Sequence, residues 1–254
     1  MPSQRKHISV HIEKTAGTSL RAFFNDLYGP EYVYTHSPTQ DVFRRTSEML
    51  FPWTYALIQP FRKRFGENRL FLVVFKLYRF IVSRRQKLYS FDNLPADYRV
   101  LHGHFCADQF GKRVDNPMLT VVLRDPLARM ISHYNHLMER KKDTDWRVHS
   151  EKLGEMTFEE FALCPEMKNY QTQAFGPYTY DDFDIVGTVE HLEDFMRKLE
   201  ALVCGRSSYV GGAKRFNESP GNYRKKYPIT DEFVKKFKDF HARDYELWER
   251  AMSL

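Results

Sequence analysis

Short apolar stretches of the chain predict four β-strands. Residues 119–124 (LTVVLR) form the continuous apolar run of a central parallel strand. Residues 7–12 (HISVHI) alternate between polar and apolar positions as a short strand does. Two further stretches, 99–105 (RVLHGHF) and 184–189 (DIVGTV), also predict strands.

Helical spacing of apolar residues follows three of these strands. The first helix after strand 7–12 has its apolar stripe at Leu20, Phe23, Phe24 and Leu27. Asp125 and Pro126 supply the N-cap and first residue of the next helix, whose stripe is Leu127, Met130, Ile131, Tyr134 and Met138. The third stripe is Leu192, Phe195, Met196 and Leu199, and a last helix is predicted from Thr230 to about Met252. Strands that alternate with helices predict an α/β fold with a parallel sheet covered on both faces.

Residues from about 36 to 96 interrupt this alternation and predict a helical insert within a single domain spanning 1–254. Leu70 to Val82 holds eleven apolar residues, with Lys76, Arg79 and Ser83 forming a polar stripe at helical spacing. Thirteen residues with two cations do not suit a bilayer span, which needs about 20 apolar residues. A helix lying in a membrane surface fits this composition. The alternative is a mostly buried helix whose cations line an acidic-substrate cleft or pair elsewhere.

Length, cysteine content and charge narrow the class of protein. The 254 residues suit one large α/β domain, and Cys106, Cys164 and Cys204 are too few and too scattered for a disulfide framework. No secretory signal opens the sequence, so we expect a cytoplasmic protein, at the membrane surface if the insert binds there. A catalytic domain separated from its anchor would instead belong in the Golgi lumen.

The net charge of +6 is unevenly distributed. Residues 61–90 hold nine Lys or Arg against one acid, Glu67, so their net charge is +8. Subtracting this from +6 leaves −2 for the remaining residues, which argues against nucleic acid as a partner of the whole chain. The local charge suits an acidic polymer or peripheral contact with a membrane through about 61–90.

The loop after the first strand, HIEKTAGTSL (11–20), combines a lysine with hydroxyls ahead of a helix start. A strand, a tight loop and a helix direct backbone N–H groups toward an anion in the loop. An ATP-binding loop reads G-x-x-x-x-G-K-[ST], whereas here Lys14 precedes Gly17. The pattern therefore predicts a phosphate-like ligand, although Thr and Ser at such junctions also serve as plain helix caps.

Three stretches in order carry a family resemblance: 14–20 (KTAGTSL), 121–137 (VVLRDPLARMISHYNHL) and 184–196 (DIVGTVEHLEDFM). They resemble the sulfotransferases that use 3′-phosphoadenosine-5′-phosphosulfate (PAPS), most closely the heparan sulfate 2-O- and uronosyl sulfotransferases and their bacterial relatives. The loop of that branch usually reads H-I-P-K-T-G/A-G/S-T-S, and its second motif reads R-x-P-x-x-R-x-x-S. The resemblance covers roughly 7–28, 99–140, 168–200 and 215–250. It implies a P-loop-NTPase-like three-layer fold, PAPS as co-substrate, adenosine 3′,5′-bisphosphate as product, and no metal.

The resemblance also implies which residues bind the donor. The cradle for the 5′-phosphosulfate would consist of Lys14, Thr15, Ala16, Gly17, Thr18 and Ser19, with Lys14 neutralising charge on the oxygen that leaves sulfur. Arg124 and Ser132 would hold the 3′-phosphate. An ion pair of Arg124 with Asp125 or another surface acid, and a helix-surface role for Ser132, are the alternatives.

Two later stretches add further candidates by resemblance. Residues 215–228 (RFNESPGNYRKKYP) resemble the loop that closes over the nucleotide, which makes Tyr223, Arg224 and Lys225 candidate donor contacts. A solvated charged loop is the alternative. Residues 167–175 (MKNYQTQAF) resemble an acceptor-side segment, in which Asn169 and Gln171 would contact sugar hydroxyls.

The stretch LHGHF (101–105) supplies a candidate base. By resemblance, His104 takes the proton from the acceptor hydroxyl, and imidazole suits this role because its unperturbed pKa is about 6.5. His102 shares the strand face of His104 by the period of two, so it would orient the substrate or support the base. Both residues would alternatively be core histidines. A zinc site is not expected, because neither H-x-H nor His133-x-x-His136 has nearby cysteines or a clear acidic ligand.

Glu13 departs from the family pattern, which usually has proline there. A carboxylate that pointed into an anion-binding loop would oppose the ligand charge, so we expect Glu13 to point away or to assist the acceptor. The leading hypothesis is a sulfotransferase acting on a hydroxyl of a polysaccharide or glycolipid. A lipid or small aromatic alcohol is the alternative acceptor. A nucleotide-binding kinase and a non-catalytic membrane or polyanion adaptor are the competing classes of protein.

Overall fold

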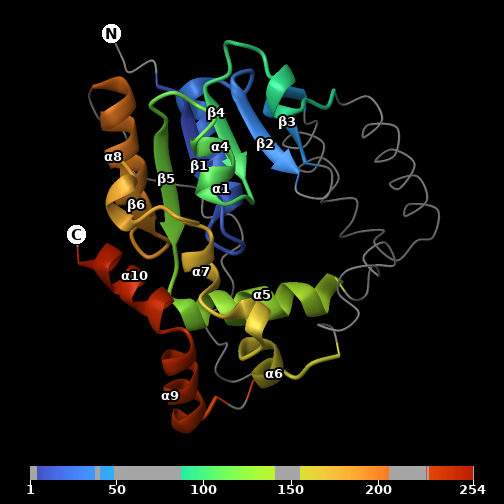
Figure 1. Ribbon diagram of the computed structural model, residues 1–254, viewed down its shortest axis with the longest axis vertical. Coiled ribbons are helices and arrows are strands. Elements are labelled where there is room, and N and C mark those ends of the chain that lie inside the picture. The colour runs from blue at the N-terminus through green and yellow to red at the C-terminus, as the bar shows by residue number, and fades with distance from the viewer. Residues whose placement is uncertain are drawn as a thin grey trace, which may run out of the picture.

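The computed structural model describes residues 5–37, 41–48, 87–140, 155–205, 227 and 229–253, which form an α/β fold around one six-stranded sheet (Figure 1). The strand order is β3-β2-β4-β1-β5-β6. The strands are β1 (His7–Val10), β2 (Val33–Ser37), β3 (Val42–Arg45), β4 (Val100–Gly103), β5 (Met118–Leu123) and β6 (Ile185–Thr188). The four predicted strands are thereby confirmed.

The sheet is parallel except at one edge. Strand β1 pairs in parallel with β4 and β5, which brings Ser9 opposite both His102 and Thr120. Strand β2 is parallel to β4, β6 is parallel to β5, and β3 alone is antiparallel, to β2. The predicted parallel sheet is confirmed for β2, β4, β1, β5 and β6.

The boundary predicted for the insert near residue 36 is wrong. Strands β2 and β3 extend the sheet to residue 45, and Phe43 forms an isolated antiparallel bridge with Tyr89. Both strands are short, and VYTHS and VFRR lack a long apolar run, so the sequence pattern did not predict them. The basic apolar segment at 69–85 lies outside the described residues. Within the described residues, no helix combines the length and apolar character of a membrane span.

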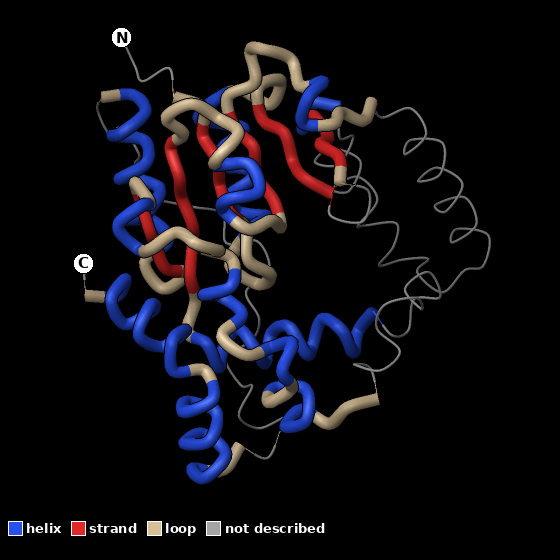
Figure 2. The backbone as a smooth tube through the Cα atoms, viewed as in Figure 1, coloured by secondary structure: helices blue, strands red, loops and turns tan. Residues whose placement is uncertain are grey.

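Helices and short 3-10 turns surround the sheet (Figure 2). The helices are α1 (Gly17–Tyr28), α4 (Ala107–Gly111), α5 (Pro126–Arg140), α6 (Phe158–Ala162), α7 (Tyr170–Gln173), α8 (Leu192–Cys204), α9 (Asp231–Phe240) and α10 (Ala242–Met252). The 3-10 turns are Thr46–Glu48, Phe91–Asn93, Pro165–Met167 and Tyr180–Asp182.

Helices cover both faces of the sheet, which gives three layers. On one face, Leu101 and Val121 pack in a cluster with Phe110 of α4 and Ala251 of α10. On the other face, the sheet residues Val100, Met118, Val122 and Ile185 pack against Leu20, Phe23 and Phe24 of α1 and Leu192, Phe195, Met196 and Leu199 of α8. Alternate residues along each strand therefore point to opposite faces of the sheet and pack against different helices, as the two-residue repeat of a strand requires.

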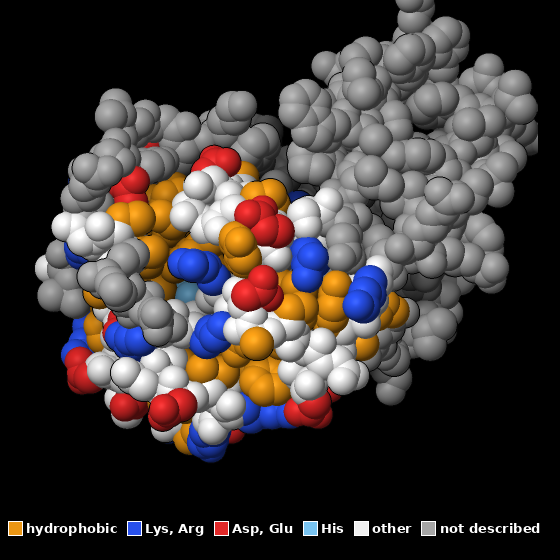
Figure 3. All heavy atoms as spheres, turned by 90° about the horizontal axis from the view of Figure 1, so that it is seen from above, with side chains coloured by type: hydrophobic (Ala, Val, Ile, Leu, Met, Phe, Trp, Pro, Cys, Tyr) orange, Lys and Arg blue, Asp and Glu red, His pale blue; other side chains and the backbone are white. Residues whose placement is uncertain are grey.

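A third apolar cluster lies beyond the carboxyl ends of the strands, where α5 runs across the lower end of the sheet (Figure 1). Its buried members include Ile131 and Tyr134 of α5, Phe161 of α6 and Phe237 of α9. The carboxyl ends of parallel strands are where ligands of open α/β sheets bind. The opposite end of the molecule shows cations, acids and apolar side chains interspersed over the described surface (Figure 3).

The single last helix predicted from Thr230 to Met252 is two helices, α9 and α10, separated at His241. The His241 ring is buried and accepts a hydrogen bond from the Asn169 N–H at Nδ1 (3.2 Å), while its Nε2 lies 2.8 Å from the Ala162 carbonyl oxygen. These contacts tie the break to α6 and α7. The apolar periodicity continues across it, so sequence spacing alone could not detect it.

Replacing Leu101 by alanine should lower the free energy of unfolding by about 2–5 kcal/mol, because the side chain is fully buried in the sheet core. Urea denaturation monitored by circular dichroism measures this change. Leu202 is 41% exposed on α8, so Leu202→Ala is the matched control and should change stability by about 0.5 kcal/mol or less. Equal losses for the two variants would contradict the core assignment.

Candidate active site

The loop between β1 and α1 has an unusual backbone conformation. Lys14 and Ala16 both have left-handed φ angles, of 71° and 64°. Such conformations in non-glycine residues are strained and concentrate at functional sites. Helix α1 begins at Gly17 with no side-chain cap on its first turn. Successive N–H groups in a left-handed turn form an anion-binding concavity, so the backbone supports the predicted phosphate-like ligand.

The sequence suggested that the hydroxyl groups of the loop all face one ligand. In the structure they do not. Thr15 is fully buried, and its Oγ1 and backbone N–H both donate to the Ile12 carbonyl oxygen, at 2.8 and 3.3 Å. The interpretation of the Thr15 hydroxyl as a ligand contact is therefore wrong, because this hydroxyl closes the loop. Thr18 is exposed and lines a cavity, whereas Ser19 is buried at the start of α1.

Arg124 links the strand β5 motif to this loop. Its Nη1 donates to the Lys14 carbonyl oxygen at 3.2 Å. Asp125, the alternative partner, instead caps α5 by accepting from the Ala128 N–H at 2.7 Å. The two predicted anion-binding segments are therefore adjacent, although 110 residues separate them in the chain.

Gln171 holds the backbone of Arg124 from both sides. Its Oε1 accepts from the Arg124 N–H (3.0 Å), and its Nε2 donates to the Arg124 carbonyl oxygen (2.9 Å). Its own N–H donates to Asp244 of α10 at 3.1 Å. The side chain is fully buried, so the prediction that Gln171 contacts sugar hydroxyls is wrong. Asn169 does not offer its amide oxygen to an acceptor either, because that oxygen is buried.

Helix α5 brings two further residues to this region. Ser132, predicted to hold the 3′-phosphate, is 4% exposed on α5. Arg129 is fully buried, its guanidinium lies 4.7 Å from the centre of the Tyr170 ring, and its Nη1 donates to His133 Nδ1 at 3.4 Å. Burial, with the adjacent Arg129 charge, lowers the pKa of His133 to about 4. The sequence analysis missed Arg129, although it is the second arginine of the R-x-P-x-x-R-x-x-S spacing.

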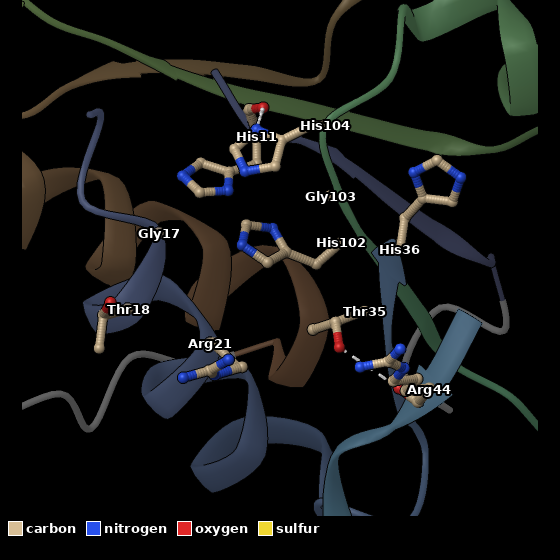
Figure 4. Close-up of a pocket in the computed structure, with 10 residues that line it drawn as sticks. All are labelled: His11, Gly17, Thr18, Arg21, Thr35, His36, Arg44, His102, Gly103 and His104. Carbon is tan, nitrogen blue, oxygen red and sulfur yellow. Dashed lines mark hydrogen bonds between the residues drawn. The ribbon is translucent and has the colours of Figure 1, made fainter. Parts of the chain in front are cut away.

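Three histidine rings stack beside the loop (Figure 4). The His11 ring lies between those of His102 and His104, with centroid distances of 4.9 and 4.2 Å. His104 Nδ1 lies 2.8 Å from the His11 carbonyl oxygen, which can only accept a hydrogen bond. Neutral His104 therefore carries its proton on Nδ1 and keeps a lone pair on Nε2, as a general base requires.

His102 and His11 are suited to supporting roles. Burial, reinforced by the charges of His104 and Arg21, lowers the pKa of His102 to about 3, and its Nδ1 hydrogen bonds with Ser9 Oγ at 3.0 Å. Burial likewise lowers the pKa of His11 well below its ordinary value. Both rings are neutral at pH 7, and the His102 ring stacks on His11, which in turn stacks on His104. The sequence analysis did not single out His11, because this residue was assigned to the alternating strand pattern of residues 7–12.

Gly17 is required by the position of the His11 ring. A Cβ atom added at Gly17 would lie 2.0 Å from His11 Cε1, far inside van der Waals contact. The absence of a side chain at this first helical residue therefore lets the histidine stack lie against the loop.

A cavity of about 290 Å³ opens between the loop, the histidine stack and strands β2 and β3 (Figure 4). Its lining consists of His11, Gly17, Thr18, Arg21, Thr35, His36, Arg44, His102, Gly103 and His104. These residues are polar, cationic or glycine, so the cavity suits a hydroxylated ligand more than an apolar one. Arg21, Thr35, His36 and Arg44 were not among the sequence candidates, because their strand and helix positions carried no motif.

Glu13 does not turn away from the site. Its Oε2 accepts from the Tyr170 hydroxyl at 2.6 Å, and its Oε1 lies 3.5 Å from His104 Nδ1. Burial acts to raise the pKa of Glu13, but the His104 field and the Tyr170 hydrogen bond outweigh it, and the net shift is downward. The carboxylate is therefore ionised at neutral pH and faces the candidate base.

Some predicted features lie outside what the structure describes. The donor candidates Tyr223, Arg224 and Lys225 fall in the range 206–226, for which no placement is described. Within the described ranges, no group of three or more His, Cys, Asp or Glu side chains is arranged to hold a metal ion.

Replacing Gly17 by alanine should lower the free energy of unfolding by about 1–3 kcal/mol, since the new methyl group overlaps the His11 ring. The same change in a His11→Ala background should be less destabilising, because the ring is gone. A double-mutant cycle measured by urea denaturation gives the coupling between the two sites. Additive effects would show that the ring does not press on Gly17.

The stability of the protein should fall as the pH is lowered through the histidine range. The unfolded chain binds a proton at His102 near pH 6.5, whereas the folded pKa is about 3, so the stability present above pH 6.5 is lost as the pH falls toward 3. The slope from this residue is about 1.4 kcal/mol per pH unit below pH 6. His102→Gln should flatten the curve of unfolding free energy against pH by about this amount. Parallel curves for the two proteins would contradict a neutral buried His102.

A comparison with protein families identifies the family of the chain. The sulfotransferase family model matches residues 2–248. The solved structure of a sulfotransferase from Alicyclobacillus acidocaldarius is similar at 14% identity and a TM-score of 0.47, covering 98% of this chain and 96% of that one. The comparison with curated proteins found no match. The family match spans nearly the whole chain, and the protein therefore belongs to the sulfotransferase family.

Proposed function

We propose that this sulfotransferase moves a sulfuryl group from PAPS to a hydroxyl of a carbohydrate. The observation that carries the proposal is the junction of Arg124 with the Lys14 carbonyl, beside a polar cavity lined by His104. This junction allows one doubly phosphorylated nucleotide to contact both anion-binding segments, with its sulfate directed toward the candidate base.

The residues fit the donor at two places. The N–H groups of Gly17, Thr18 and Ser19 at the uncapped start of α1 suit the 5′-phosphosulfate, with Lys14 to balance the charge that develops on the departing phosphate oxygen. Arg124 and Ser132 suit the 3′-phosphate. Tyr223, Arg224 and Lys225 remain proposed contacts from the family resemblance.

His104 supplies the proton transfer in this proposal. Its Nε2 accepts the proton of the acceptor hydroxyl as that oxygen forms a bond to sulfur. The bond from sulfur to the phosphate oxygen breaks, and adenosine 3′,5′-bisphosphate leaves with that electron pair. The Nδ1 contact with the His11 carbonyl fixes the ring orientation and the tautomer throughout. As in phosphoryl transfer, positioning and electrostatics provide most of the rate.

The cavity lining supports a carbohydrate acceptor over a lipid or aromatic alcohol. Histidine, threonine and arginine side chains provide hydrogen-bond partners for several hydroxyls, and no apolar side chain appears among the described lining residues. Arg21 and Arg44 further favour a sugar that carries an acidic group.

Adenosine 3′,5′-bisphosphate should stabilise the protein against thermal unfolding, whereas ATP should not. A ligand at 100 times its Kd adds about 2.7 kcal/mol, which is a shift of roughly 5–10 °C for a protein of this size. Arg124→Ala should abolish the shift, because it removes the contact that joins the two anion-binding segments. Arg243 is exposed on α10, so Arg243→Ala is a matched control that should keep the shift. A larger shift with ATP and magnesium would favour a kinase instead.

His104→Ala should keep the thermal shift but lower sulfate transfer about 10²–10⁴-fold, the usual contribution of a general base. The assay follows radiolabelled sulfate from PAPS to an acidic polysaccharide, a neutral polysaccharide, a glycolipid and a phenol. We expect transfer to the acidic polysaccharide. Transfer to the phenol alone would contradict the carbohydrate proposal, and unimpaired transfer by His104→Ala would remove the base assignment.

A further inference from the structure

We infer that Glu13 is a positioning residue for His104, held by Tyr170 so that its carboxylate stabilises the imidazolium formed when the base takes the acceptor proton. The inference rests on the proposed function, because His104 needs such support only if it acts as the base.

The contacts of His104 define what Glu13 does. The Nδ1 proton is donated to the His11 carbonyl oxygen at 2.8 Å, whereas Glu13 Oε1 is farther away, at 3.5 Å. The carbonyl therefore sets the tautomer, and the carboxylate acts through its charge. Once Nε2 is protonated, the positive imidazolium lies beside a fixed negative charge, and an opposite charge at this distance favours the protonated form.

The contacts of Glu13 fix its orientation. The Tyr170 hydroxyl donates to Oε2 at 2.6 Å, so the other carboxylate oxygen, Oε1, is the one near His104. The Tyr170 ring in turn lies against the buried guanidinium of Arg129, 4.7 Å from the ring centre. A continuous set of contacts therefore runs from α5 through α7 to the loop and ends at the base.

The charged and titratable groups around this pair and the adjoining histidine rings come from several elements. They are Lys14 of the loop, His11 just after β1, Arg21 of α1, His102 of β4, Arg129 and His133 of α5, and Tyr170 of α7. His11, His102 and His133 are neutral at pH 7 because burial lowers the pKa of each. The remaining charged members of this set, Lys14, Arg21 and Arg129, are cations. Among the described residues, Glu13 is the acid paired with His104, and its negative charge offsets these cations.

Substituting Glu13→Gln keeps the size of the side chain and its capacity to accept from Tyr170, but removes the charge. Histidine ¹⁵N NMR of the full chain with adenosine 3′,5′-bisphosphate bound should show the titration of His104 moving to lower pH, with proton affinity about 10-fold lower. Tyr170→Phe should give a smaller shift in the same direction, because it frees the carboxylate to rotate. Glu246 is exposed on α10, so Glu246→Gln is the matched control that should leave the titration unchanged.

The acid limb of the pH profile for kcat/KM should move to lower pH in Glu13→Gln, and kcat on the plateau should fall about 10- to 100-fold as the base weakens. Thermal stabilisation by adenosine 3′,5′-bisphosphate should be retained, which a general structural defect would not allow. An unchanged His104 titration, or an unchanged pH profile and kcat, would overturn the inference while leaving the proposed function intact. If the wild-type protein transfers no sulfate to any acceptor, the proposed function fails, and the catalytic role of Glu13 fails with it.

Discussion

The hydrogen bond from the Arg124 guanidinium to the Lys14 carbonyl is the constraint on which the rest of the site depends. It fastens the end of β5 to the loop that follows β1, the neighbouring strand. A carbonyl oxygen that accepts from a cation makes a stronger hydrogen bond than one that accepts from a neutral donor, and here the residue concerned, Lys14, has a left-handed backbone. The arginine thereby helps to maintain the conformation that turns the N–H groups of the loop outward. One side chain therefore holds the loop and places a positive charge beside the candidate anion site.

The histidine stack places an imidazole beside a cationic loop without adding further positive charge. Burial keeps His11 and His102 neutral, so these rings add no positive charge beside the candidate base His104. Gly17 provides the room for the middle ring. The stack, the loop and strands β2 and β3 together enclose a cavity without apolar side chains in its described lining. A cavity with this polar lining suits a hydroxylated ligand.

Local pattern was sufficient to predict the elements that carry the loop, the β5 motif and the helices after them, because each has a clear apolar period and a motif at its end. Strands β2 and β3 were not predictable in this way, since VYTHS and VFRR are short and take their stability from pairing, β2 with the distant strand β4 and β3 with β2. The roles of Gln171 and Glu13 depend on partners that are distant in the sequence, and the role of Thr15 depends on the conformation of its own loop. From the sequence alone, Gln171 would be taken for a polar surface residue. In the structure its amide group hydrogen bonds with both the backbone N–H and the carbonyl oxygen of Arg124. Sequence reasoning identified which segments meet, but not which side chains line the cavity.

Asp244 has a consequence for how the protein matures. It accepts hydrogen bonds from the backbone N–H groups of Gln171 and Thr172, and so α10 anchors the short helix α7 that clasps Arg124. On the ribosome, the first strand, its loop and the β5 arginine emerge long before residue 244. The nascent chain therefore lacks the support that sets its arginine in place until α10 has been synthesised and has docked, so the candidate anion site should be among the last features of this polypeptide to form.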